Sequence, residues 1–476
     1  MLLLFIAWLA GNTFTFQSKQ IQYDPVVAIE INSASTVNFS HAIQIRTVSP
    51  ENPADFDSTQ FYQFAAFLKT TYPLADSLLE KKVFNTFSYL YKWEGADLTL
   101  KPIVLMAHLD VVPVLSENIP HWKHDPFGGN IVNDTIWGRG AIDDKIGVIG
   151  IMETVERLLS EGYQPKRTIY LSLGHDEEIG GTNGAKTIAA FLLEQAVEAE
   201  FVIDEGGTIS QGLVPGLEKD VALIGIAEKG ILTLELSVEI EGGHSSMPEK
   251  ETAIDVLSAA IARVKENPLP AKITPPIDAF IEALGPEMPF LNKLAFANKG
   301  VFRSMIIGAY EKSASGNALV RTTTSPTIFN SGVKENVIPR SAKAIVNFRV
   351  LPETTFEEVE AFIRKVVNDD RISITAVKTR SEPSAVSSVS SLGYQTLARS
   401  IAEVYPETLI SPYLVVGATD SRHFKDISAD IYRFSPIKIN RGNIKSFHGL
   451  NERLAVAELE NALRFYYQLI KNGASE

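Results

Sequence analysis

Residues 101–112 read KPIVLMAHLDVV and contain the pattern that decides the fold. The apolar run at 103–106 is flanked by turn-forming and polar residues, as a buried strand is. A second run of this kind covers residues 168–173. Between the two, apolar residues recur at helical spacing over 146–159, and Gly162 follows as a C-terminal cap. The pattern predicts a strand, a helix and a strand, the repeating unit of a mostly parallel sheet.

The same alternation continues along the chain. A helical stretch at 187–194 precedes a strand at 201–203, and the segment AVAELENALRFYYQLIKNG predicts an amphipathic helix that ends near Gly473. At 476 residues the chain is too long for one ordinary core. We therefore expect an α/β protein with two domains.

The pattern of apolar and polar residues changes at Gly230. There ILTLELSVEIEGG alternates apolar and polar residues, as a strand with one face in water does, and AKAIVNFRV repeats the pattern later. We read this part as a small inserted α+β domain, in which residues 268–325 form an elaborated loop region with weak periodicity. The predicted division is 1–34 for an N-terminal segment and linker, 35–229 and 354–476 for the two parts of the catalytic domain, and 230–353 for the insertion.

Composition excludes several classes of protein. Hydrophobic residues make up 45 % and charged residues 21 %, which is typical of a water-soluble globular protein. The formal net charge of -13 disfavours nucleic acid as a partner, because affinity for phosphate backbones depends on clustered Lys and Arg. The chain has no cysteine, so any metal must be held by His, Asp or Glu.

The chain begins with the apolar run MLLLFIAWLAG. This run is shorter than the roughly 20 residues that a helix needs to span a bilayer, and it resembles the apolar part of a signal peptide or a clipped signal anchor. We expect an exported protein, cleaved or tethered to a membrane at this end. The alternative is a surface helix docked on the domain.

Acidic residues and one histidine follow directly after three predicted strands. His108 and Asp110 follow the first strand, Asp176, Glu177 and Glu178 the second, and Asp204 and Glu205 the third. Carboxyl ends of parallel strands form the ligand-binding crevice of an open sheet, so these side chains should converge there. A fourth group, Asp143 and Asp144 in WGRGAIDDKIG, lies where a Gly-rich turn enters a helix.

A crevice lined by several carboxylates needs a cation, since like-charge repulsion would otherwise be severe. One His with several carboxylates and no thiolate suits zinc, with cobalt or manganese possible in the same site. A carboxylate that bridges two ions would hold them about 3.5–4 Å apart, as in two-metal hydrolases. Taken singly, each group has another explanation, since Asp143 and Asp144 could cap a helix and His108 could be a core residue. Their coincidence at one sheet edge favours a metal site.

Six motifs in order resemble one enzyme family. HLDVVP, GRGAIDDK, HDEEIGG, IDEGG, EGGHSSMP and SFHGLNER are similar to the co-catalytic dinuclear zinc peptidases that include carboxypeptidase S, aminoacylase and acetylornithine deacetylase. The resemblance covers nearly the whole chain. FQSKQIQY and NALVRTTTSPTIFNSGVKENVIP look closest to the carboxypeptidase S and secreted N-acyl amino acid hydrolase branch.

The resemblance implies two Zn²⁺ ions per chain and a role for each motif residue. Asp143 would bridge the ions, and the remaining ligands would be His108, Glu178, Asp204 and His448. Asp110 would orient His108, and Glu177 would be the general base that takes a proton from the attacking water.

The insertion would be the lid and dimerisation domain of this family. His244, in EGGHSSMP, resembles the His that stabilises the oxyanion in the active site of a partner subunit. Arg349 resembles the Arg that binds the substrate carboxylate, and Gly417 falls in a matching loop near the substrate. The long stretch 268–325 is absent from compact members of the family.

Two substrate classes stay open from the sequence. The chain would be a carboxypeptidase on short peptides or an amidohydrolase on N-acyl amino acids, because both reactions use the same catalytic groups. Four Phe residues of the insertion would suit an apolar acyl chain or simply form core: Phe280, Phe290, Phe296 and Phe302. A metal-binding protein without activity is the third reading, and Glu177 argues against it because a ligand cage needs no free base. Neither G-x-S-x-G nor H-E-x-x-H occurs.

Overall fold

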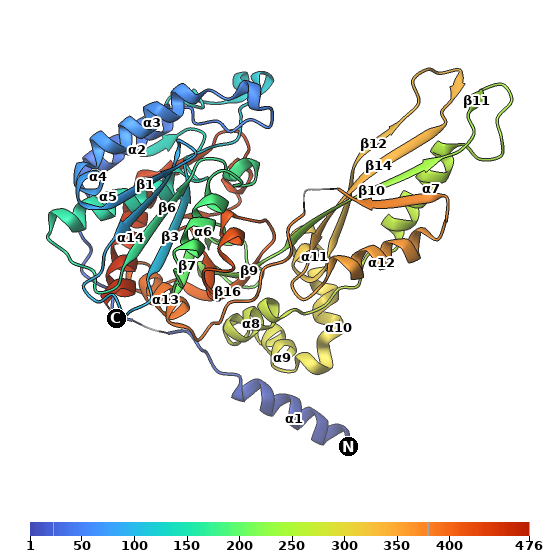
Figure 1. The fold of residues 1–476 in the computed structure, drawn as a ribbon. Coiled ribbons are helices and arrows are strands. Elements are labelled where there is room, and N and C mark those ends of the chain that lie inside the picture. The colour runs from blue at the N-terminus through green and yellow to red at the C-terminus, as the bar shows by residue number, and fades with distance from the viewer. Residues whose placement is uncertain (22, 378–379, 476) are drawn as a thin grey trace.

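The structure is a computed structural model that describes residues 1–476 except 22, 378, 379 and 476. A large mixed sheet forms the body of the molecule, with the strand order β1-β2-β6-β3-β7-β17-β9-β8-β18 and β16 beside β9 (Figure 1). Its strands are β1 (Glu80–Phe84), β2 (Ser88–Trp93), β3 (Ile103–His108), β6 (Ile169–Gly174), β7 (Phe201–Asp204), β8 (Ile209–Ser210), β9 (Val221–Glu228), β16 (Leu409–Val415), β17 (Ile431–Arg433) and β18 (Lys438–Ile439). The central strands β6, β3, β7 and β17 run parallel, as predicted.

Helices cover both faces of this sheet. They are α2 (Ser33–Gln44), α3 (Ser58–Thr71), α4 (Pro73–Leu78), α5 (Lys145–Ser160), α6 (Ala185–Glu194), α13 (Leu392–Val404) and α14 (Val456–Ser475). Alternate residues of β3 feed two separate cores: Leu105 packs with α5, α13 and α14, and Met106 packs with α6. The predicted strands and helices of this part are confirmed, with α14 ending two residues later than expected.

Short elements complete the catalytic part around the sheet edge. They are β4 (Asn130–Val132), β5 (Thr135–Trp137), β19 (Arg453–Ala455) and the 3-10 turns η1 (Pro53–Asp55), η2 (Ser116–His121), η3 (Glu177–Ile179), η5 (Asp420–Phe424) and η6 (Ile444–Ser446). The small sheet β19-β5-β4 carries the C-terminal segment back to the turn before α5. This brings residues near 448 to the end of β3.

A second, antiparallel sheet projects away from the body (Figure 1). Its order is β12-β14-β10-β15, and helices α7 and α12 share one core with it. The elements are β10 (Gly230–Glu239), β11 (Gly243–His244), α7 (Ala253–Glu266), β12 (Thr323–Ser331), β13 (Val337–Ile338), β14 (Ser341–Val350), α12 (Phe356–Val367) and β15 (Ile372–Ala376). The predicted boundary at residue 353 is therefore too early, because α12 and β15 complete the inserted domain.

The stretch 268–325 is mostly helical, which corrects the prediction of a loop region. It contains α8 (Pro275–Leu284), η4 (Gly285–Glu287), α9 (Phe290–Ala297), α10 (Lys299–Tyr310) and α11 (Ala314–Val320). These helices pack on β9 and β16 of the catalytic part, through contacts such as Ile281 with Leu414. Phe280, Phe296 and Phe302 belong to these cores, whereas Phe290 lies on the surface.

The N-terminal apolar segment forms α1 (Leu2–Thr15), which packs against α9. This matches the alternative of a docked surface helix. In the part of the chain that the structure describes, no helix combines the length and the apolar character needed to cross a membrane. Export remains a prediction for this chain.

Candidate metal centre

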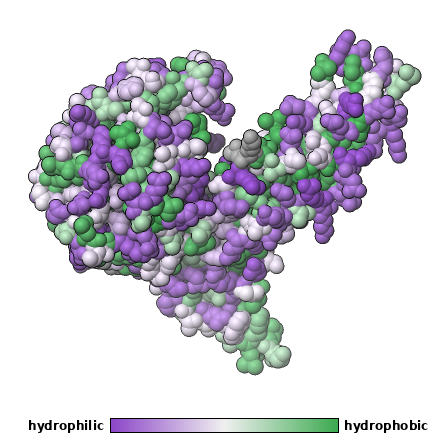
Figure 2. Space-filling model, in the orientation of Figure 1, coloured by the Kyte–Doolittle hydropathy of each residue, from purple (hydrophilic) through white to green (hydrophobic). Residues whose placement is uncertain are grey.

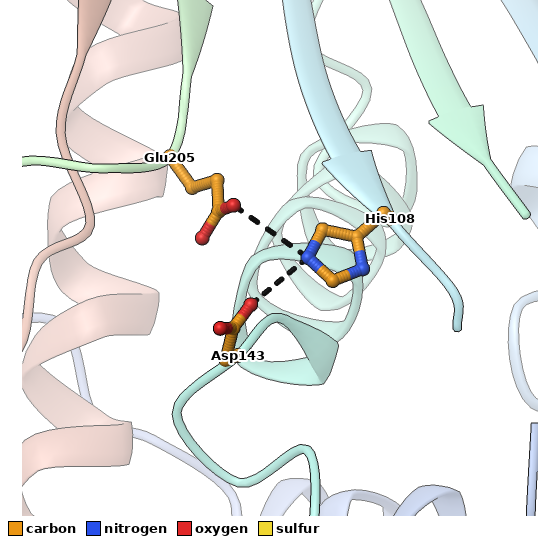
Figure 3. Close-up of side chains that lie close together, drawn as sticks. All are labelled: His108, Asp143 and Glu205. Atoms are coloured by element: carbon orange, nitrogen blue, oxygen red, sulfur yellow. Dashed lines mark hydrogen bonds and ion pairs between the residues drawn. The ribbon is translucent and has the colours of Figure 1, made fainter. Parts of the chain in front are cut away.

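The last residue of β3 is at the centre of the site. The buried ring of His108 donates through Nδ1 to the backbone carbonyl of Asp110 at 3.0 Å. This contact turns Nε2 toward two carboxylates, Asp143 Oδ1 at 3.0 Å and Glu205 Oε1 at 3.6 Å (Figure 3). Nε2 is thus the ring atom that is free to bind a metal ion.

Asp143 lies between two histidines. Its Oδ1 faces His108, and its Oδ2 lies 3.0 Å from Nε2 of His448, which is also 3.3 Å from Oε2 of Glu178. Within the described residues, two groups of possible metal ligands therefore share one carboxylate: His108, Asp143 and Glu205 form the first, and Asp143, Glu178 and His448 form the second. This is the arrangement in which one carboxylate bridges two ions.

A buried ion pair fixes the turn that presents Asp143. Glu452 accepts the backbone N–H of Ile142 at 2.7 Å and that of Asp143 at 3.2 Å, and pairs with Arg139 at 2.6 Å. The neighbouring Asp144 caps α5 by accepting from the backbone N–H of Gly147. Asp144 therefore caps the helix, and Asp143 faces the two histidines.

Asp110 has a second role besides its contact with His108. Its fully buried carboxylate accepts the backbone N–H of Glu177 at 3.1 Å and that of Glu178 at 3.2 Å. It therefore fixes the turn η3, in which one Glu joins the ligand group and the other stays free. Among the described residues, no hydrogen bond holds the carboxylate of Glu177. This leaves it available to move a proton.

Electrostatics in the site follow from crowding of charges. Burial and then the charge of Asp143 raise the pKa of Glu205 to about 7. Burial lowers the pKa of His108, but its contacts with Asp110, Asp143 and Glu205 outweigh this and raise it overall. Contacts with Asp143 and Glu178 raise the pKa of His448 to about 10. The surrounding carboxylates thus raise the pKa values of both imidazoles, and divalent ions held by these residues would offset the same negative charge.

Asp204, which was predicted as a ligand, lies outside both groups of possible metal ligands. Its Oδ2 accepts the backbone N–H of Ser421 at 2.7 Å, so it stabilises the turn η5, and Glu205 is the acid that faces His108. The IDEGG motif contains both acids; the sequence predicted Asp204 as a ligand, and in this structure Glu205 is the acid that lies beside His108.

Sequence reasoning also missed Asp420. This buried acid lies against the turn that carries Glu177, because a Cβ at Gly181 would overlap the Asp420 carboxylate. Burial and then the charge of Asp420 raise the pKa of Glu177 well above its usual range. In the sequence Asp420 is the acid of TDSR, three residues after Gly417.

The three predicted substrate residues lie in different places. Arg349 is on β14 near the junction with the catalytic part, where burial and then Arg422 lower its pKa. Gly417 is exposed in the loop after β16. His244 lies on β11 at the far end of the inserted domain, where it is exposed and its Nδ1 is 2.8 Å from Ser246 Oγ (Figure 1). Within one chain the structure does not bring His244 to the metal ligands.

Comparison with known proteins matches this architecture. Residues 104–472 match the family model described as Peptidase family M20/M25/M40. The "Probable carboxypeptidase S-like 2" of Dictyostelium discoideum is 38 % identical over 472 residues, covering 97 % of this chain and 90 % of the relative. The "N-fatty-acyl-amino acid synthase/hydrolase PM20D1" of Xenopus tropicalis is 39 % identical over 438 residues, 91 % of this chain and 85 % of the relative.

Solved structures show the same fold. A metallo-carboxypeptidase of the M20 family from Sulfolobus solfataricus, Sso-CP2, superposes with a TM-score of 0.69 at 17 % identity, covering 92 % of this chain and 99 % of that one. Human carnosine dipeptidase 1 gives a TM-score of 0.63 at 14 % identity, with 93 % and 96 % coverage. The resemblance inferred from the six motifs is confirmed.

Proposed function

We propose that this chain, which belongs to peptidase family M20/M25/M40 and is therefore a metal-dependent hydrolase, holds two Zn²⁺ ions and cleaves an amide bond next to a free carboxylate. The observation that carries the proposal is the position of Asp143 between His108 and His448, 3.0 Å from each. The ligands would be His108, Asp143, Glu178, Glu205 and His448. This set of His and carboxylate donors without sulfur suits zinc, and would also accept cobalt or manganese.

Bound zinc would supply Lewis acidity and would lower the pKa of a water molecule in the site. Glu177, whose carboxylate is free of hydrogen bonds among the described residues, would take the proton of the attacking water and return it to the leaving amine nitrogen. Asp110 would keep Glu177 in place, because its carboxylate accepts the backbone N–H of Glu177. The residues of this chain thus divide into ligands, a mobile base and a group that holds the base.

Substrate recognition would depend on the free carboxylate. Arg349, half-buried beside Arg422, would pair with that group through its guanidinium fork. A free carboxylate is shared by a short peptide and an N-acyl amino acid. We propose the carboxypeptidase reaction on short peptides as the main activity, in keeping with the name of the Dictyostelium relative. Hydrolysis of N-acyl amino acids is the alternative, in keeping with the name of the Xenopus relative.

The test combines metal content with hydrolysis of a substrate panel. The panel pairs N-blocked dipeptides with N-acyl amino acids, each as free carboxylate and as amide. We expect two ions per chain, and hydrolysis only of substrates with a free carboxylate. Glu177→Gln should keep both ions and lose turnover by about 10²–10⁴-fold. The exposed Glu194→Gln on α6 is the matched control and should behave as wild type. Metal-free protein and equal rates in all variants would exclude the proposal.

A further inference from the structure

Exposed apolar side chains gather at one end of the molecule, away from the metal centre. They lie on α1 and on the neighbouring α9, and Figure 2 shows the apolar tip that α1 forms. Leu3 on α1 is 82 % exposed and Leu291 on α9 is 75 % exposed, and Phe5, Trp8 and Phe290 are also exposed. A contiguous apolar surface of this kind marks a binding surface.

This apolar tip is fixed to the fold and is not a loose tail. Asn12 donates through Nδ2 to Oδ1 of Asn298 at 2.9 Å, and Nδ2 of Asn298 donates to the Leu9 carbonyl at 3.2 Å. The ring of Phe16, just after α1, packs closely against Gly285. The C-terminal half of α1 is therefore anchored next to α9, while its N-terminal half extends beyond the helical layer.

The charges beside the tip are opposite in sign to the charge of the whole chain. The two helices α9 and α10 contain Lys293, Lys299 and Arg303 and no acidic residue, in a chain of net charge -13, and Glu287 and Glu311 lie just outside them. Lys299 pairs with Asp278 and Glu282 on α8. For Lys293 and Arg303, the described part of the structure contains no ion pair, so both cations are available to an external anion.

We propose that α1, α9 and α10 form a docking surface for an anionic lipid bilayer, with the exposed N-terminal half of α1 entering the apolar part of the bilayer. The apolar and aromatic side chains lie on α1 and at the start of α9, and the free cations lie beside them on α9 and α10; this combination suits an anionic lipid surface.

A second copy of the chain fits this surface less well. A symmetric contact between two copies brings the same patch of each copy together, including Lys293 and Arg303. Because α9 and α10 contain no acidic residue, neither helix of the second copy would offer a carboxylate to pair with these cations. An anionic lipid surface can bury the apolar side chains of the tip and neutralise both cations at the same time.

The experiment is flotation of the full chain with vesicles of phosphatidylcholine alone or mixed with phosphatidylglycerol. We expect binding that requires the anionic lipid and weakens with salt. The pair Phe5→Glu with Leu291→Glu should abolish binding. The pair Lys293→Glu with Arg303→Glu should weaken it on the order of tenfold or more. The exposed Leu98→Glu in the catalytic part is the control and should bind as wild type.

Fluorescence of Trp8 gives an independent readout. Its emission should shift to the blue with anionic vesicles, and Trp8→Phe should remove the shift, since Trp93 and Trp122 are buried and the half-buried Trp137 lies on β5 of the catalytic part. Hydrolysis of a water-soluble substrate should be unchanged in the surface variants, which verifies that they fold. Absence of vesicle binding, equal binding of all variants, or self-association through this surface without vesicle binding would each overturn the proposal.

Discussion

Asp204 and Glu205 are adjacent in the chain and contact different partners. The Asp204 carboxylate accepts the Ser421 backbone N–H at 2.7 Å, and Glu205 Oε1 lies 3.6 Å from His108 Nε2. Because β7 ends at Asp204, successive side chains leave the strand on opposite sides. One acid therefore stabilises the turn η5, and the other faces His108.

We predict different effects of neutralising these two acids. Glu205→Gln should weaken binding of one metal ion by about 10–100-fold or more, because a charged oxygen ligand is lost. Asp204→Asn should keep metal affinity nearer to wild type and lower the unfolding midpoint, since it disturbs the hydrogen bond to Ser421. Metal titration with a chelator and thermal unfolding measure the two effects. The reverse result, with metal loss only in Asp204→Asn, would restore Asp204 as the ligand.

Much of the metal centre could be predicted from the sequence because its residues directly follow apolar strands. A run such as residues 103–106 can only be buried, so the polar groups after it must lie at the sheet edge. The choice between Asp204 and Glu205 could not be made, since it depends on a loop more than two hundred residues later in the chain. The local pattern of apolar residues predicts the strand. The direction in which the first side chain after the strand points depends on tertiary contacts.

The misread parts of the fold have a similar cause. Helices α8 to α10 share their apolar residues among β16, α1 and one another, so no single apolar stripe appears in the sequence. Strand β15 joins the inserted sheet by pairing with β10, from Val238 with Ile372 to Leu234 with Ala376. No local pattern in the sequence indicates that distant pairing, and the predicted boundary at 353 consequently missed it.

The buried pair of Arg139 and Glu452 should be important for stability. Arg139→Met would leave Glu452 as an unpaired buried charge beside the turn of Asp143, at a cost of about 3–5 kcal/mol in the free energy of unfolding. Arg157→Met is the matched control, because its pair with Glu161 is partly exposed and should contribute about 0.5 kcal/mol. Urea unfolding followed by Trp fluorescence compares them. Equal losses in both variants would contradict the prediction.

Lys229 should make stability depend on pH. It lies between β9 and β10 and donates to the carbonyls of Ala318 at 2.9 Å and Arg321 at 2.8 Å. Burial and then the charge of Arg349 lower its pKa from 10.5 to about 7. Between these values the unfolded chain binds more protons, so the free energy of unfolding gains a contribution as pH rises from about 7 toward 10.5. Below pH 7 the full cost of the buried charge remains.

The measurement for Lys229 compares wild type with Lys229→Met from pH 6 to pH 10. The variant should lose this pH-dependent contribution, and any advantage it has over wild type should shrink as pH rises. Lys69→Met on the exposed side of α3 is the control and should follow wild type. A constant difference between Lys229→Met and wild type across the range would rule out the lowered pKa.

His244 lies at the far end of the inserted domain. We predict that it acts in the active site of a partner subunit. The side chain is exposed on β11, which pairs with β13, and among the described residues its hydrogen-bond partner is Ser246 in its own turn. A symmetric dimer would let this end reach the metal centre of the other chain. His244→Ala alone should then lose most of its turnover while keeping its metal, because an oxyanion donor is removed.

Mixing inactive chains tests this prediction directly. A mixed dimer of His244→Ala and Glu177→Gln contains one centre with an intact base and an intact His244 from the other chain. Random reassembly should restore about a quarter of the wild-type sites. Met247→Ala, an exposed change in the same turn, is the control that should keep full activity. No recovery on mixing, together with normal turnover in His244→Ala, would show that this histidine plays no part in the reaction.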